Sequence, residues 1–286
     1  MTVAFALIRA LHFASLMGVF GASALLAQAR RTGIDVARFR VALFMGSVVA
    51  LVTAVLWLFF VSAEMGGGGK FGLHVTYLVL RGTYFGDSFV QRAWLLVALC
   101  GLCLLRDVQA VKAVIAGAAL ALLGWTSHAA AAGNPRYDDL RAGIDALHLL
   151  AAGFWLGGLV VLVPQVLAKP RNIPRLTALL RLFSRWGAVS VAVLIVAGTL
   201  NAVAILDVPG MRWSGTYVTL LAIKIVLAAV MVALALTNRF GVLPGLERGE
   251  AEASETIPLT VLAELGAALL IVLIVGFLGL EPPMAM

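Results

Sequence analysis

The feature that most restricts the fold is a series of eight apolar stretches, each long enough to cross a lipid bilayer. A helix of roughly 20 apolar residues spans the hydrocarbon core. The chain is 62% hydrophobic and 12% charged, whereas soluble domains are about 45–50% apolar and about 25% charged. We therefore expect an all-α polytopic membrane protein with a single integral membrane domain, residues 1–286. The expected spans are residues 3–27, 38–63, 88–106, 109–131, 142–167, 185–206, 216–238 and 257–280.

The basic residues predict the orientation of these spans. Lys and Arg gather in one alternate set of loops, at 28–40, 106–112, 168–185 and 239–250. The positive-inside rule places this set in the cytoplasm and both termini outside. The net charge of +7 is then explained by loops that face anionic lipid, without nucleic acid. The longest loop, 64–90, is expected outside, without a core of its own.

All four histidines are expected toward the outer side. His12, His128 and His148 lie at similar depths on the first, fourth and fifth spans, and Asp145 precedes His148 by one turn. For any one of them a hydrogen bond between helices is the simpler interpretation. Ionisable groups inside a membrane are nevertheless functional candidates, and neutral imidazole binds metal ions. We therefore predict an outer-leaflet metal site formed by His12, His128, His148 and Asp145.

Further polar and aromatic residues are expected around this site. Trp155 lies two turns beyond His148, and Trp125 lies one turn before His128. Arg92, at the start of the third span, is expected to extend to a membrane surface. Glu264, nearer the cytoplasm, is a candidate for proton coupling. The predicted pocket residues besides the ligands are Trp155, Trp125, Arg9, Lys224 and Asn201.

Sulfur ligands could receive a metal ion at either membrane surface. Cys100 and Cys103 lie in the inner half of the third span, where thiolates would suit Cu(I) or Zn²⁺ as exit ligands. Two small residues that pack in a helix are the simpler interpretation. His74, Met284 and Met286 are candidates for capture of a metal ion on the outer side.

A weak internal repeat relates the first and fifth spans. Ala-Leu-His, then eight residues, then Gly occurs at Ala10–Gly21 and again at Ala146–Gly157. The pattern favours two parallel four-helix halves, residues 1–131 and 142–280, an arrangement known among transporters. If the halves pack about a pseudo-axis, Arg9 and Asp145 are placed to form an ion pair.

The segment Asp145–Leu159, with its D-x-x-H-x6-W-x-G-G-L pattern, resembles the copper resistance protein D (CopD) family of bacterial inner-membrane proteins. A histidine in the first span and Ser127-His128 at the end of the fourth add to the resemblance. It implies movement of copper from the periplasm toward the cytoplasm, with functional positions at His12, His128, His148, Asp145 and Trp155. It also implies a separate periplasmic copper carrier of the CopC type, which could dock on the 64–90 loop.

Three classes of function remain open from the sequence. The first is a copper transporter, for which imidazole suits Cu(I) and Cu(II) alike. The second is an electron-transfer protein that binds haem through two of the same histidines. The third is a copper-sequestering or assembly protein that transports nothing. No P-loop, HExxH or GxSxG motif occurs, so no enzyme is expected.

Overall fold

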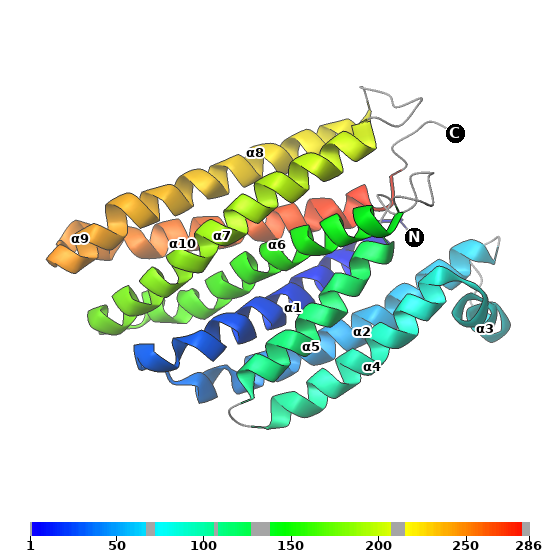
Figure 1. The fold of residues 1–286 in the computed structure, drawn as a ribbon, viewed down its shortest axis with the longest axis horizontal. Coiled ribbons are helices and arrows are strands. Elements are labelled where there is room, and N and C mark those ends of the chain that lie inside the picture. The colour runs from blue at the N-terminus through cyan, green and yellow to red at the C-terminus, as the bar shows by residue number, and fades with distance from the viewer. Residues whose placement is uncertain (1, 67–71, 106–107, 127–137, 207–214, 282–286) are drawn as a thin grey trace.

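The computed structural model describes residues 2–66, 72–105, 108–126, 138–206 and 215–281, which form a bundle of long helices (Figure 1). No β-strand occurs within these ranges, as the composition predicts. The long helices are α1 (Thr2–Gln28), α2 (Arg40–Met65), α4 (Tyr84–Leu104), α6 (Asp138–Leu167), α7 (Ile173–Leu206), α8 (Thr216–Thr237) and α10 (Ala251–Leu278). The shorter helices are α3 (Leu73–Gly82), α5 (Gln109–Ala121) and α9 (Leu243–Arg248). Short 3-10 and π segments are η1 (Ala29–Thr32), η2 (Val36–Phe39), η3 (Leu122–Thr126) and the π-helical η4 (Asn238–Val242).

Seven of the eight expected spans are long and apolar enough to cross a membrane within the described ranges. Of the segment expected at 109–131, the structure describes α5 and the 3-10 turn η3 that continues it to Thr126. Residues 127–131 lie outside the described ranges, so the eighth span stays a prediction. The start of α1 and the end of α10 lie at the same end of the bundle (Figure 1).

Several segments expected as loops are helical, including 239–250, which contains most of η4 together with α9. The expected outer loop 64–90 contains α3 and the first turns of α4, and Thr76 and Val79 of α3 are buried. Its assignment as a loop without a core was wrong, because these residues pack beside α2 and α4. Likewise α7 begins at Ile173, well before the expected start at 185. Its first turns are amphipathic, and the buried side chains follow helical spacing: Leu176, Leu179, Leu180 and Phe183.

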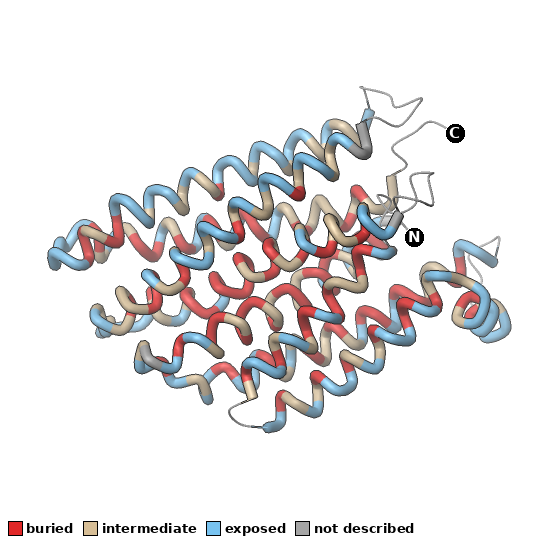
Figure 2. The backbone as a smooth tube through the Cα atoms, in the orientation of Figure 1, coloured by how far each residue is buried: buried red, intermediate tan, exposed pale blue. Residues whose placement is uncertain are grey.

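The centre of the bundle is the contact between α1 and α6, which carry much of the buried core, whereas α8 is largely exposed (Figure 2). Glycines permit this close approach. A Cβ at Gly157 would lie 2.5 Å from the Cα of Gly21, and a Cβ at Gly21 would overlap the carbonyl oxygen of Gly153. The two glycines of the sequence repeat therefore meet each other, as expected for two halves related by an axis between α1 and α6.

A second pair of contacts follows the same correspondence. Gly276 of α10 packs against Ala6 and Ala10 of α1, while Gly124 of η3 packs against Ala142 and Ala146 of α6. Positions 6 and 10 correspond to 142 and 146 at the same offset as His12 to His148. The two expected halves differ in how their helices pack. In the first half α2 packs along α4, whereas the corresponding helices α7 and α8 make at most marginal contact. The second half is therefore more open than the first.

Candidate functional site

His12 lies in the first of two polar clusters, between α1, α2 and α4. The imidazole is fully buried, and its Nδ1 lies 3.0 Å from the carbonyl oxygen of Ala50. Because a carbonyl can only accept, Nδ1 carries the proton and Nε2 is the acceptor. Nε2 is buried without a hydrogen-bond partner among the described residues. The ring also meets the indole of Trp57 edge-on, with 5.6 Å between centroids.

Two guanidinium groups share this cluster. Cζ of Arg9 lies 4.6 Å and Cζ of Arg92 lies 5.5 Å from the centroid of the Trp57 ring, within cation–π range. Arg92 is fully buried, and its three nitrogens have no hydrogen-bond partner in the described part of the chain. The expectation that Arg92 extends to a membrane surface was wrong: the aromatic face of Trp57 holds it inside. Both cations act electrostatically on His12, and the carboxylate of Glu64 offsets part of the charge of Arg9, so the cluster keeps a net positive charge.

His148 lies in the second cluster, between α6, α7 and α8. The imidazole is hydrogen-bonded to the backbone of Leu194, one α7 turn before Gly198. Nδ1 is buried without a hydrogen-bond partner among the described residues. Gly198 faces this edge: a Cβ there would lie 3.4 Å from Nδ1 and 3.2 Å from Cε1.

The rest of the second cluster balances its charge. Nδ2 of Asn201 donates to Oδ1 of Asp145 at 3.1 Å. Lys224 of α8 interacts electrostatically with both Asp145 and His148. The predicted pocket residues Asn201 and Lys224 thus gather with His148 and Asp145. One carboxylate and one ammonium leave this cluster close to neutral.

The two histidines face away from each other for a geometric reason. Each lies nine residues before the glycine at the α1–α6 contact, His12 before Gly21 and His148 before Gly157. At about 100° per residue, nine residues correspond to about half a turn. The glycines face the neighbouring helix, so each imidazole faces into its own half.

The predicted convergence of three imidazoles is therefore not what the described residues form. No group of three or more His, Cys, Asp or Glu able to hold a metal ion occurs among them. His128 lies outside the described residues. The predicted ion pair of Arg9 with Asp145 is replaced by other partners, because Arg9 lies over Trp57 and Asp145 accepts from Asn201.

The other predicted residues lie apart from both histidines. Trp125 is 46% exposed and donates to Asp139 at 3.2 Å, so it does not wall either cluster. His74 is exposed on α3. Cys103 is buried with Sγ 3.4 Å from Oγ of Ser47 in α2, and Cys100 is half-buried on the same helix. Met284 and Met286 lie outside the described residues.

Trp155 connects helix α6 to a carboxyl group on helix α10. Its Nε1–H donates to Oε2 of Glu264 at 3.1 Å, and Nδ2 of Asn238 donates to Oε1 at 2.6 Å. The hydroxyl of Thr260 donates to Oδ1 of Asn238 at 2.6 Å. Glu264 is 1% exposed and lies near the middle of α10. Sequence reasoning singled out Glu264 and Trp155 separately but missed Asn238, which follows the last residue of α8.

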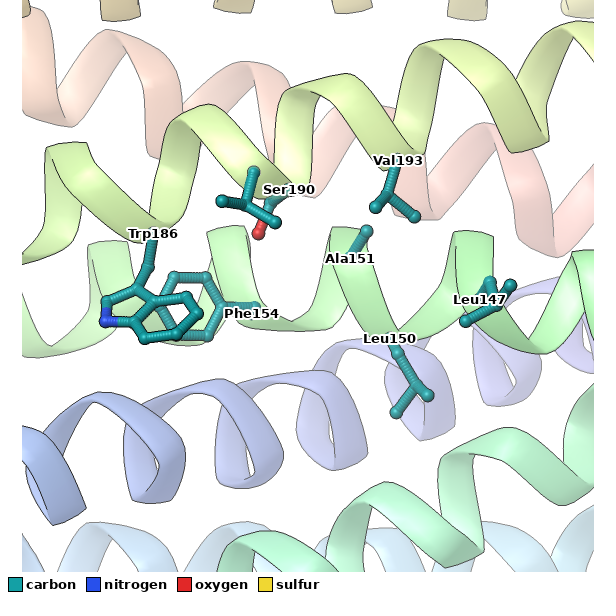
Figure 3. Close-up of a pocket in the computed structure, with 8 residues that line it drawn as sticks. Leu147, Leu150, Ala151, Phe154, Trp186, Ser190 and Val193 are labelled. Atoms are coloured by element: carbon teal, nitrogen blue, oxygen red, sulfur yellow. The ribbon is translucent and has the colours of Figure 1, made fainter.

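Two hollows lie beside these groups. A cavity of about 350 Å³ between α6, α7, α8 and α10 is lined by Trp155, Glu264, Asn238, Ser184 and Arg239 together with apolar side chains. A smaller apolar groove between α6 and α7 contains Phe154, Trp186 and one hydroxyl, that of Ser190 (Figure 3). The groove offers no set of metal ligands, whereas the cavity reaches a carboxyl group.

Seven apolar helices with ionisable side chains buried between them define a polytopic helical membrane protein with polar sites inside the bundle. The model of the copper resistance protein D-like N-terminal domain matches residues 1–137, and the model of copper resistance protein D matches residues 177–278. The chain belongs to the copper resistance protein D family, as the resemblance at residues 145–159 implied.

Two relatives place the chain in its membrane. It is 33% identical to copper resistance protein D of Pseudomonas syringae pv. tomato, over 93% of this chain and 91% of the relative. It is 27% identical to inner membrane protein YebZ of Escherichia coli strain K12, over 96% of this chain and 97% of the relative. No solved structure matches the chain. Together with the seven apolar helices, these relatives make it a multi-pass protein of the bacterial inner membrane.

Proposed function

We propose that the protein moves copper from the periplasm toward the cytoplasm and that His148 is its first ligand inside the membrane. The observation that carries this proposal is the buried Nδ1 of His148, which has no hydrogen-bond partner within the described ranges and lies opposite Gly198. The backbone of Leu194 holds the ring, so an incoming ion does not have to reorganise the imidazole. Imidazole accepts copper in either oxidation state. The protein acts on copper as cargo, without enzymatic chemistry.

Charge favours His148 over His12 as the copper ligand. Two unit charges 4 Å apart repel by about 4 kcal/mol at the effective dielectric typical near protein surfaces, and a buried site screens less. His12 lies beside Arg9 and Arg92, whereas the charge of Lys224 is offset by Asp145. A copper cation is thus repelled from the first cluster and tolerated in the second. His12 then ties α1 to α2 through Ala50.

The remaining ligands and the periplasmic partner are further parts of this proposal. Asp145 belongs to the same cluster as His148 and could bind the ion or orient another ligand. His128 stays a predicted ligand. Family membership favours a periplasmic copper carrier of the CopC type as the donor protein. Cys100 and Cys103 stay predicted exit ligands, although Cys103 packs against α2, away from the second cluster.

Copper uptake into proteoliposomes tests the function directly. Vesicles that contain the purified protein should accumulate copper faster than protein-free vesicles under the same gradient. A protein that only sequesters or assembles copper would bind it stoichiometrically without filling the vesicle lumen, and this result would contradict transport. A Soret band in the purified protein would instead support haem binding.

A methyl group at position 198 should block the His148 site without removing any ligand. In Gly198→Ala the new Cβ would lie 3.4 Å from Nδ1, in the space where an ion must approach this nitrogen. We expect copper affinity to fall by roughly 10–100-fold, the range seen when the support of a metal ligand is disturbed. Copper titration of the purified variant measures this. Gly187→Ala on the same helix is the control, because a Cβ there meets nothing within 4 Å. Equal affinity in both variants would place the ion elsewhere.

A further inference from the structure

Glu264 is a carboxyl group inside the membrane with neutral partners. Both of its oxygens accept hydrogen bonds, one from the indole of Trp155 and one from the amide of Asn238. It takes part in no ion pair within the described ranges. An unpaired charge buried in low dielectric costs several kcal/mol, and binding of a proton removes that charge. The position therefore suits a group that gains and loses a proton.

The partners of Glu264 can satisfy both protonation states. With the carboxylate ionised, Nδ2–H of Asn238 donates to Oε1 and the hydroxyl of Thr260 donates to Oδ1 of Asn238. With the carboxyl protonated, rotation of the amide by half a turn lets Oδ1 accept the carboxyl proton and Nδ2–H donate to Thr260. The hydroxyl of Thr260 then donates to the carbonyl of Ile257 at 3.2 Å or of Thr256 at 3.4 Å. An amide serves as donor or acceptor at nearly the same atomic positions, so no backbone movement is needed.

The cavity beside Glu264 supplies a route for the proton. Its volume of about 350 Å³ has room for on the order of ten water molecules, at about 30 Å³ each. Glu264 and Asn238 line it together with Arg239, which is itself exposed. The gap between α7 and α8 that forms this cavity has no counterpart between α2 and α4. Arg239 belongs to the segment 239–250, whose basic residues predict a cytoplasmic position.

Charged groups on the helices packed against α10 do not compete for Glu264. On α8, the cation Lys224 interacts electrostatically with Asp145 and His148. On α6 the contact is the neutral Trp155, and on η4 the cavity-lining cation Arg239 donates to the carbonyl of Ser184 at 2.8 Å. On α1, Arg9 lies against Gly279, more than a dozen residues along α10 from Glu264, and His12 faces α2. On α9, Glu247 pairs with Arg181 and Arg248 pairs with Glu250.

We propose that Glu264 is a proton-binding site that exchanges protons with the cytoplasm through the cavity between α6, α7, α8 and α10, and that this exchange is coupled to copper movement. Water in the cavity donates a proton to one carboxylate oxygen, and release returns it to water. His148 and Trp155 lie seven residues apart on one face of α6, so the copper ligand and the indole bonded to Glu264 share one rigid helix. Only the coupling rests on the proposed copper transport; proton binding by Glu264 does not.

Infrared difference spectroscopy on the purified protein tests the proton site without copper. A change of pH should produce the C=O stretching band of a protonated carboxyl group in the wild type, and Glu264→Gln should abolish it. Glu252→Gln, an exposed glutamate on the same helix, is the matched control and should retain the band. Asn238→Leu keeps Glu264 but removes its partner, so the band should persist at a shifted frequency. An unchanged band in Glu264→Gln, or an unshifted one in Asn238→Leu, overturns the assignment.

Copper uptake under an imposed pH gradient tests the coupling. Wild-type uptake should respond to the gradient, and Glu264→Gln should bind copper normally but lose the response. If both proteins respond equally, the coupling is wrong although the carboxyl still binds a proton. If the wild type takes up no copper, the proposed function fails while the infrared result stands on its own.

Discussion

Replacement of His148 by Ala should remove most of the copper that the purified protein retains. The variant loses the buried Nδ1 of the imidazole, which is unpartnered in the part of the chain that the structure describes. Disturbing only the support of a metal ligand costs roughly 10–100-fold in affinity, so loss of the ligand itself should cost at least as much. Elemental analysis of detergent-purified protein, with copper and protein measured on the same sample, gives the stoichiometry.

Two further histidine variants make this result specific. His74→Ala removes an exposed imidazole on α3 and should leave the copper content unchanged. His12→Ala removes the hydrogen bond to Ala50 and should lower stability more than copper content, because Arg9 and Arg92 already repel a cation there. Full copper occupancy in His148→Ala, or loss of copper in His12→Ala alone, would transfer the site to the first cluster.

Gly21→Ala should destabilise the whole bundle. A Cβ at position 21 would overlap the carbonyl oxygen of Gly153 and lie 2.9 Å from the Cα of Phe154, so α1 and α6 must separate. Overpacking of a tight core typically costs about 1–3 kcal/mol, and contact with the backbone, which cannot rotate away, places this variant at or above the upper end. Thermal unfolding in detergent, followed by circular dichroism, should show a clear fall in Tm.

Gly266→Ala on α10 is the control with the opposite sign. A Cβ there meets nothing within 4 Å, and Ala is favoured over Gly inside a helix by roughly 0.5–1 kcal/mol. This variant should unfold at the wild-type temperature or slightly above it. If Gly21→Ala matches Gly266→Ala, the close contact of α1 and α6 is not a determinant of stability.

The sequence predicts the spans well because a lipid environment demands long apolar helices with internally satisfied backbone groups. The sequence does not predict helical structure where a helix extends beyond its apolar span. The first turns of α7 were assigned to a loop because Arg175, Arg181 and Arg185 lower the mean hydropathy of this segment, although its apolar side chains pack against the core. Helix α3 was missed for a different reason: its ten residues, of which only Thr76 and Val79 are buried, are too few for a membrane span.

The site was predicted in part. Asp145, Asn201, Lys224 and His148 gather in one polar cluster, because they lie at compatible depths on three neighbouring helices. The meeting of His12 with His148 was assumed from depth alone. The repeat contains the information that corrects this assumption. The nine-residue spacing to each glycine places each imidazole on the side of its helix that faces away from the α1–α6 contact. Trp57 carried no signal as a partner of Arg92, since an indole is usual in an apolar span.

The packing of α2 on α4, which α7 and α8 lack, has a consequence for how the bundle can move. With α2 and α4 packed together around a buried arginine, the first half is suited to act as a rigid frame. The contacts of α1 with α6 and α10, and of η3 with α6, fasten the second half to this frame. Any rocking that alternately opens the two membrane faces would therefore be carried by α7 and α8, which make at most marginal contact with each other.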